Sequence, residues 1–220
     1  VGEILETGEN SRAKIEVADI GQVEIAPNSL VKLVNSSDTE HRLALEYGSL
    51  EAKIFAPPRL FVVDTPTAQA VDLGCAYTLD VDKAGNSKLH VTSGYVALER
   101  DGRESIVPAG AFCLTRRGRG LGTPFFETAS EEFKENLWKF DFETGGEKYL
   151  DSIIENAKAK DTLTLWHLIP RVSGKDREKV FKKILKFAKL PYGVTKKGIL
   201  EADKVMLDDW RYEIELNWYE

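Results

Sequence analysis

Side chains able to carry acid–base, nucleophilic or metal chemistry are few in this chain of 220 residues, and they are scattered along it. The histidines, His41, His90 and His167, show neither an HExxH pattern nor a paired ligand spacing, which favours structural or surface roles. The sequence also lacks a Gly-x-Ser-x-Gly nucleophile elbow. We therefore expect no enzyme activity, no metal site and no cofactor.

The two cysteines and the paired carboxylates support the same expectation. Cys75 and Cys113 each fall in a strand-like run, and Cys75 has no neighbouring histidine or cation in the sequence to activate it, so we expect a core residue. A disulfide between them stays open, because the sequence does not show whether their strands are neighbours. Asp80 and Asp82 share one strand face, an arrangement common on solvated surfaces, so neither a calcium site nor a glycosidase pair follows.

The segment RRGRGLG at residues 116–122 is the most unusual polar stretch. Its glycine order does not fit a phosphate loop, and no Lys-Ser/Thr follows. Arg116, Arg117 and Arg119 beside flexible glycines are candidates to bind an acidic partner or an anionic glycan. The alternative interpretation is a mobile linker between two parts of the chain.

Aromatic residues near the C-terminus are the other candidates for a partner surface. Trp218 and Tyr219 lie where exposure is expected, whereas Trp138, Trp166 and Trp210 have the helical spacing that is typical of core packing.

Composition and charge limit the classes of partner. A formal net charge of -6 and a pI near 5.3 argue against a nucleic-acid partner, which needs an electropositive face. No apolar run approaches the ~20 residues that span a bilayer. Because the first residue is Val1 and not Met, a targeting or membrane segment could lie upstream in the full-length protein.

Period-two alternation of apolar residues dominates the chain from Arg12 to about Arg116, interrupted every few residues by Gly, Pro, Asn or Asp. This pattern predicts about twelve short strands and excludes a doubly wound α/β fold. We expect an all-β domain over residues 1–127, either an antiparallel sandwich or a short β-solenoid-like stack. Leu45-Glu46-Tyr47-Gly48-Ser49-Leu50 also resembles Val91-Thr92-Ser93-Gly94-Tyr95-Val96, a weak internal echo.

The pattern becomes helical after Thr128. Capping-box spacings begin at Thr128 and Thr144, Ser173 precedes another apolar stripe, and Thr195 is expected to begin one last helix. Residues 128–220 are therefore predicted to form an α-helical C-terminal region that packs on the β-domain or forms a small bundle, and we favour packing.

The order of motifs in the β-region resembles the FecR domain. The resemblance starts at Gly21-Gln22-Val23-Glu24-Ile25-Ala26-Pro27-Asn28-Ser29 and covers roughly residues 12 to 116. It continues through the two echo segments, Phe61-Val62-Val63-Asp64-Thr65-Pro66, Leu73-Gly74-Cys75 and Pro108-Ala109-Gly110. The motif positions to which we assign structural roles are Gly48, Thr65, Pro66, Gly74 and Gly94.

FecR-like proteins are extracytoplasmic, single-span regulators that relay a signal from an outer-membrane receptor to a sigma factor. The resemblance implies a non-enzymatic sensing or protein-interaction module in the periplasm, anchored by an upstream transmembrane segment absent from this chain. The implied partner is a receptor signalling domain or a membrane-associated regulator. The alternative is a secreted or surface module that binds carbohydrate or another small ligand.

Overall fold

The computed structural model describes residues 1–216, which form two compact units with a boundary between Gly122 and Thr123. The boundary expected from the sequence lies between residues 127 and 128. Among the described residues, no helix is both long and apolar enough to cross a membrane.

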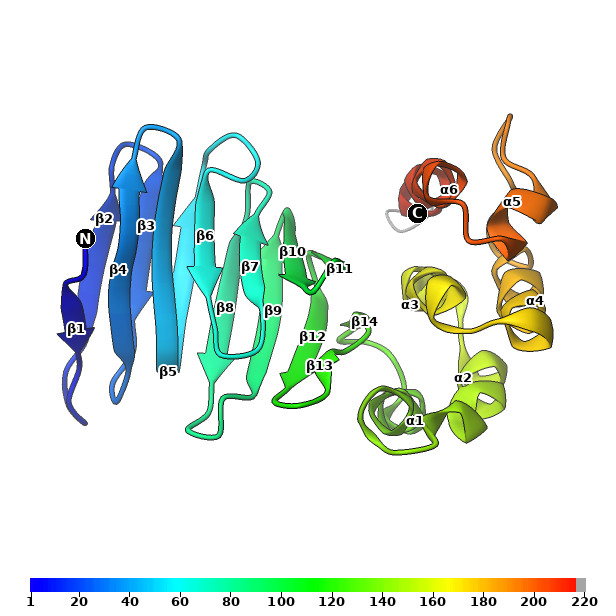
Figure 1. The fold of residues 1–220 in the computed structure, drawn as a ribbon, viewed down its shortest axis with the longest axis horizontal. Coiled ribbons are helices and arrows are strands. Elements are labelled where there is room, and N and C mark those ends of the chain that lie inside the picture. Colours follow the sequence, from blue (N-terminus) through cyan, green and yellow to red (C-terminus); the bar gives the residue numbers. More distant parts are fainter. Residues whose placement is uncertain (217–220) are drawn as a thin grey trace. The chain divides into compact units, whose positions relative to one another are not determined.

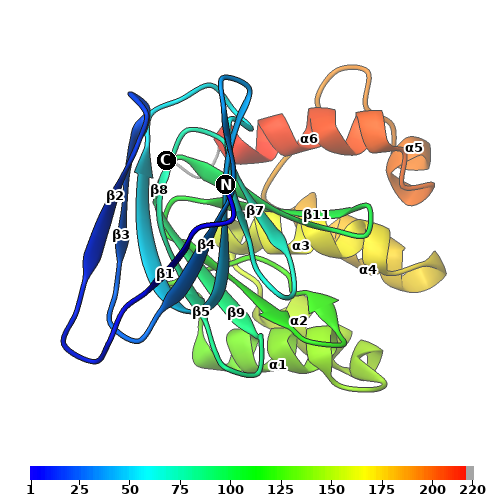
Figure 2. The same cartoon turned by 60° about the vertical axis from the view of Figure 1, so that its left-hand side comes forward.

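The first unit consists of β-strands in two layers (Figures 1 and 2). Layer A has the order β1-β4-β5-β6-β7-β10-β11, and layer B has the order β2-β3-β5-β8-β9-β12-β13. The strands are β1 (Ile4–Glu6), β2 (Ala13–Val17), β3 (Gly21–Ile25), β4 (Leu30–Ser37), β5 (Glu40–Ile54), β6 (Phe61–Asp64), β7 (Gln69–Asp72), β8 (Ala76–Val81), β9 (Ser87–Ser93), β10 (Tyr95–Arg100), β11 (Arg103–Pro108), β12 (Ala111–Arg116) and β13 (Gly120–Leu121). This arrangement confirms the predicted all-β domain, although the β5–β6 pair is parallel.

Strand β5 belongs to both layers. Its first half pairs with β4 and β6 in layer A, and from Gly48 onward it pairs with β8, and further along with β3, in layer B. β5 runs without interruption for 15 residues. Gly48 has a φ of 99°, so the backbone turns from one layer into the other without ending the strand.

After β5 the chain forms hairpins that alternate between the layers: β6–β7 in A, β8–β9 in B, β10–β11 in A and β12–β13 in B. Gly74 and Gly94 lie at two of the crossings, with φ values of 90° and 67°. A Cβ atom on Gly94 would lie 2.1 Å from the Gly74 carbonyl oxygen, so the two corners touch. Gly48 and Gly94 therefore mark layer crossings in both segments of the internal echo.

Thr65 and Pro66 lie in the β6–β7 turn. The Thr65 hydroxyl accepts hydrogen bonds from the backbone N–H groups of Thr67 (3.3 Å) and Ala68 (3.0 Å), which fixes the turn and the register of its two strands. The assigned structural role of this motif thus has a local physical basis.

The core of the β unit lies between the layers. In β8, Tyr77, Leu79 and Val81 are buried, whereas Asp80 between them is exposed. This is the burial pattern of a strand with one face in a core, and it is the reason why alternation identified the strands correctly.

The second unit is helical, as predicted. Its elements are β14 (Phe125–Phe126), α1 (Glu131–Phe142), η1 (Gly146–Tyr149), α2 (Leu150–Asn156), η2 (Ala159–Asp161), α3 (Thr162–Leu168), η3 (Ile169–Arg171), α4 (Gly174–Ile184), α5 (Lys196–Leu200) and α6 (Lys204–Leu216), where η denotes a 3-10 helix.

Two helix boundaries differ from the sequence interpretation. Ser130, not Thr128, is the N-cap of α1, and its side chain accepts from the Phe133 N–H at 3.3 Å. Thr195 caps α5, but the expected single last helix is divided into α5 and α6, because Ala202 adopts a left-handed φ of 57°.

Tryptophan side chains contribute to the helical core. Trp166 donates its indole N–H to the Leu207 carbonyl at 2.8 Å, and Trp210 donates to the Lys189 carbonyl at 2.9 Å. The predicted core role is correct for both, but Trp138 is 37% exposed, so the core prediction is wrong there. Trp218 and Tyr219 lie outside the described residues.

Candidate interaction site

The β unit carries two crevices at the end where β1, β2 and β4 lie. The larger has a volume of about 460 Å³ and the smaller of about 140 Å³, and both are lined by Ile15, Leu33 and Leu43. The larger is completed by Glu3, Ile4, Leu5, Glu6 and Val31. The smaller is completed by Glu16, Val17, Ala18, Asn35, Ser36, His41, Arg42 and Phe61.

Strand lengths explain why this end is open. β1 has three residues, and its paired positions on β4 are Leu30 to Lys32, whereas β4 continues to Ser37. The register of β4 against β5 also shifts between Leu33 and Asn35. The outermost strands therefore do not close the space between the layers, and aliphatic side chains that point inward line a crevice.

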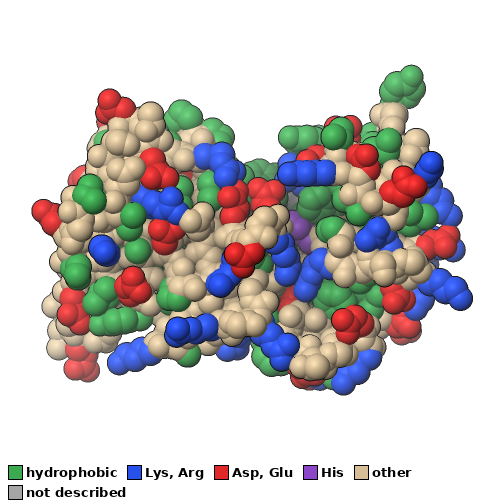
Figure 3. Space-filling model, viewed as in Figure 1, with side chains coloured by type: hydrophobic (Ala, Val, Ile, Leu, Met, Phe, Trp, Pro, Cys, Tyr) green, Lys and Arg blue, Asp and Glu red, His purple; other side chains and the backbone are tan. Residues whose placement is uncertain are grey.

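The rim of the larger crevice is acidic. Glu3 and Glu6 line it, and no Lys or Arg is among its lining residues. Figure 3 shows hydrophobic and acidic side chains next to each other at the left end of the view, over β1 and β4. The Tyr47 hydroxyl donates to the Glu6 carboxylate at 2.8 Å, and this hydrogen bond raises the pKa of Tyr47.

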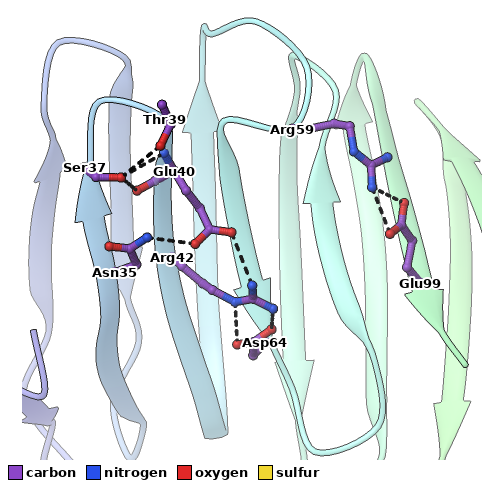
Figure 4. Close-up of polar contacts among 8 residues, drawn as sticks. All are labelled: Asn35, Ser37, Thr39, Glu40, Arg42, Arg59, Asp64 and Glu99. Atoms are coloured by element: carbon purple, nitrogen blue, oxygen red, sulfur yellow. Dashed lines mark hydrogen bonds and ion pairs between the residues drawn. The ribbon is translucent and has the colours of Figure 1, made fainter.

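Charged side chains on layer A are arranged in fixed pairs (Figure 4). Arg42 donates two hydrogen bonds of 2.8 Å to the Asp64 carboxylate and contacts Glu40 at 3.2 Å. The hydrogen bond with Asp64 is the main reason why the pKa of Arg42 is raised. Farther along the layer, Arg59 and Glu99 lie 2.8 Å apart.

Arg42 also lines the smaller crevice, so the pairing with Asp64 holds its guanidinium in one place beside Leu43 and Phe61, which line the same crevice. Side chains held in a bidentate pair of this kind lose little further conformational entropy when another protein binds. The arrangement suits recognition by contact.

The three arginines of the RRGRGLG segment belong to the β12–β13 hairpin. Arg116 pairs with Gly120, Arg119 donates its backbone N–H to the Arg116 carbonyl at 3.0 Å, and the Arg117 N–H donates to the Asn86 side chain at 3.1 Å. The linker interpretation is therefore wrong, since the segment is a turn within the β unit. Binding of an acidic partner by Arg116, Arg117 and Arg119 stays a prediction.

A buried polar cluster lies at the β7–β8 corner. The Asp72 carboxylate accepts from the Gly74 N–H and from the Cys75 thiol, each at 2.6 Å. Burial raises the pKa values of Asp72, Cys75 and Tyr77. A thiol with a raised pKa is a poor nucleophile, and this agrees with a core role for Cys75.

Cys75 and Cys113 are both buried, and the structure does not join them in a disulfide, which answers the open question. The Tyr77 hydroxyl, fully buried beside this cluster, has no hydrogen-bond partner among the described residues.

The histidines lie apart from one another. The His90 ring stacks on Phe112 at 4.1 Å, His41 borders the smaller crevice, and His167 is buried in α3. Within residues 1–216, no group of three His, Cys, Asp or Glu side chains is placed to hold a metal ion.

Sequence reasoning missed the crevices and the Arg42–Asp64 pair. Alternation indicated that Ile15 and Leu43 face inward, but nothing in the pattern shows that the layers end without closing beside them. Arg42 and Asp64 come from strands paired in parallel, a pairing that the sequence did not suggest.

Residues 3–97 match the family described as FecR protein. The predicted resemblance to the FecR domain is confirmed over that range.

Two crystal structures of a candidate anti-sigma factor from Parabacteroides distasonis resemble the chain. One, at 2.50 Å resolution, has a TM-score of 0.50 and 11% identity, covering 63% of this chain and 64% of that one. The other, at 1.65 Å, has a TM-score of 0.49 and 10% identity, covering 62% and 65%. The match thus spans less than two thirds of that protein, and at this identity the likeness concerns the fold. No curated protein matches the chain.

Proposed function

We propose that this chain is the extracytoplasmic sensing and protein-interaction part of a FecR-like regulator of the anti-sigma type. It works by contact with another protein, such as a receptor signalling domain or a membrane-associated regulator, and it has no catalytic role. An upstream transmembrane segment anchors it in the full-length protein.

The observation that carries this proposal is the FecR match over residues 3–97, which falls on the two-layer β unit. The surface of that unit gives physical support. Its crevices lie in a β frame held by glycine corners, and the charges of Arg42, Asp64 and Glu40 are already paired in the free protein. A preorganised surface binds with less loss of conformational entropy than a mobile one.

The location can be tested with alkaline phosphatase fused to the C-terminus of the full-length gene product. The enzyme folds only outside the cytoplasm, so an active fusion is the expected result. A fusion that is inactive, while the same junction fused to a cytoplasmic reporter is active, contradicts the extracytoplasmic proposal.

The regulatory role can be tested by replacing the chromosomal gene with one that lacks the codons for residues 1–122. We expect a defined set of transcripts to lose its response to the inducing condition, becoming either constitutive or silent, with a complete gene deletion as the reference. A transcript profile that responds as in the wild type contradicts the proposal.

The carbohydrate-binding alternative has less support. Sugar-binding sites rely on aromatic side chains as apolar platforms. Phe61 is the one Phe, Tyr or Trp among the residues that line the two crevices, and it is buried, so neither crevice offers such a platform.

A further inference from the structure

The edge of layer B at β2 offers backbone hydrogen-bonding groups that the fold does not use. Within residues 1–216, β2 pairs with β3 alone, so its other side has no neighbouring strand. The five residues of β2 pair in continuous register from Ala13 to Val17, with no bulge and no proline. These are two of the devices by which proteins usually block an exposed edge, and β2 lacks both.

Hydrogen bonds on the far side of β3 show which groups of β2 point outward. The Ala26 N–H donates to the Ser49 carbonyl at 3.0 Å, and the Phe55 N–H donates to the Ile20 carbonyl at 2.7 Å. Both hydrogen bonds join the segment around β3 to the segment around β5. Because bonding direction alternates along a strand, the even-numbered positions of β3 bond to β5 and its odd-numbered positions bond to β2.

The β2–β3 register then shows which backbone groups of β2 bond to β3 and which point outward. Ile15 pairs with Val23, an odd-numbered position, so the backbone of Ile15 bonds to β3. The intervening residues Lys14 and Glu16 direct their N–H and C=O groups away from β3, toward solvent. Their side chains are exposed and form an ion pair at 2.6 Å.

The side chains beside this edge favour apolar contact. Ile15 points to the interior and lines both crevices, and Ile4 of β1 is 66% exposed at the mouth of the larger one. A strand added to β2 would direct every second side chain toward this apolar region. Glu3 and Glu6 make the lining of the larger crevice acidic, whereas Glu16 beside the smaller crevice is paired with Lys14.

We infer that the β2 edge binds an extended segment of a partner protein by strand addition. The segment carries apolar side chains at alternate positions and is flanked by Lys or Arg, whose charges complement Glu3 and Glu6 in the larger crevice. This inference rests on the proposed function and specifies where and how the contact is made.

The test uses the 220-residue chain and three synthetic peptides. The first alternates valine and threonine and has two lysines at each end. The second has glutamates in place of the lysines, and the third has asparagine in place of valine. We expect the lysine-flanked peptide to bind about tenfold more tightly than the glutamate-flanked one at low salt, with a smaller difference at high salt. The asparagine peptide should not bind measurably.

Hydrogen exchange of single amides distinguishes strand addition from a loose apolar contact. The amides of Lys14 and Glu16 should exchange rapidly in the free chain and become protected when the lysine-flanked peptide is bound. The amide of Ile15, already bonded to β3, should change little. Peptide binding without protection of Lys14 and Glu16 would overturn the inference.

Two variants at one position supply the matched control. Glu16→Pro removes an outward N–H that β3 does not use, whereas Glu16→Gln removes the charge and retains the N–H. We expect Glu16→Pro to weaken peptide binding about tenfold beyond the effect of Glu16→Gln. If Glu16→Pro lowers the melting temperature, weaker peptide binding could come from a damaged fold. The amide-exchange result on the unmodified chain then decides whether strand addition occurs at β2.

The two proposals can fail separately. If residues 1–122 prove dispensable in the cell, the proposed function fails, and peptide binding at β2 is still measured directly. If the cell experiment succeeds but the unmodified chain binds none of the peptides, the inference is wrong and the functional contact lies on another surface. Self-association through β2 in place of peptide binding, seen as a dimer that Glu16→Pro abolishes, also overturns it.

Discussion

Asp72 is a carboxylate that the fold holds at the β7–β8 corner with 1% of its surface exposed. Burial raises its pKa above the ordinary value near 4, and the hydrogen bonds from Gly74 and Cys75 only partly oppose this. The folded chain therefore retains the Asp72 proton at pH values where the unfolded chain has released it.

The sign of the pH effect follows. The Asp72 side chain contributes its full stabilisation at pH values below the pKa that it has in the unfolded chain. This contribution is lost as the pH rises through the pKa of Asp72 in the folded chain. In Asp72→Asn this loss is absent, and the amide oxygen can still accept from the Gly74 N–H. We expect the melting temperature of Asp72→Asn, relative to the wild type, to increase between pH 4 and pH 8. A constant difference across that range would contradict the prediction.

Asp82 provides the opposite case. Its side-chain hydrogen bond with Asn86 lowers its pKa, so its stabilising contribution is present above the unfolded pKa and is lost as the pH falls through the folded pKa. Asp82→Asn should therefore be less stable than the wild type at pH 7, with the deficit shrinking toward pH 3. Thermal melts of both variants in the same buffers compare the two signs directly.

Among the elements, the corners between layers depend most on single residues. Gly94→Ala would place a Cβ 2.1 Å from the Gly74 carbonyl oxygen at a φ of 67°, so we expect about 3 kcal/mol of destabilisation or more. Gly102→Ala has a φ of 75° in open space and should cost about 1 kcal/mol. Gly74→Ala, with a nearest contact of 3.7 Å, should cost about as much as Gly102→Ala. The free energies of unfolding measured in urea give the order of the three variants. Equal losses of stability in Gly94→Ala and Gly102→Ala would show that the corners do not touch.

In the helical unit, one ion pair joins the start of the unit to its helices. Arg171 contacts Asp141 and Thr123, and the Asp141 carboxylate, with 3% of its side chain exposed, also accepts from the Thr123 N–H at 2.7 Å. Arg171→Met leaves a buried carboxylate without its cation, and we expect a loss of about 3 kcal/mol in urea unfolding. The double variant Arg171→Met with Asp141→Asn should recover part of it.

Lys139→Met is the control for that substitution. It removes the surface pair with Glu135, which spans one helical turn at 2.6 Å, and should change stability little. Similar losses in Arg171→Met and Lys139→Met would mean that burial does not strengthen the Asp141 pair.

Over the whole molecule, the sequence predicted what local patterns determine. Alternation identified the β-region, and capping residues and apolar stripes identified the helical region. Within the motifs that resemble FecR, Gly48, Gly74 and Gly94 lie at layer crossings, and Thr65 and Pro66 lie in a turn. These features depend on residues close together in the chain.

The rest depends on pairing between distant segments. The parallel contact of β5 with β6, the Arg42–Asp64 pair and the open end beside Ile15 follow from the order of strands in each layer, which alternation does not encode. The boundary within the last predicted helix was missed for a local reason: Ala202 is a good helix former and gives no signal of its left-handed φ.

The shared strand β5 has a consequence for synthesis of the chain. When the ribosome has released residues 1–54, β3 and β4 can already pair with β5, but its partners β6 and β8 end only at residues 64 and 81. Until then, a single nascent strand exposes an open edge in each layer at once, a state in which β-rich chains aggregate. When the 220-residue chain is produced by itself in the cytoplasm of an expression host, a pause while residues 55–81 emerge from the ribosome should therefore lower the yield of soluble protein more than an equal pause after residue 122 has emerged.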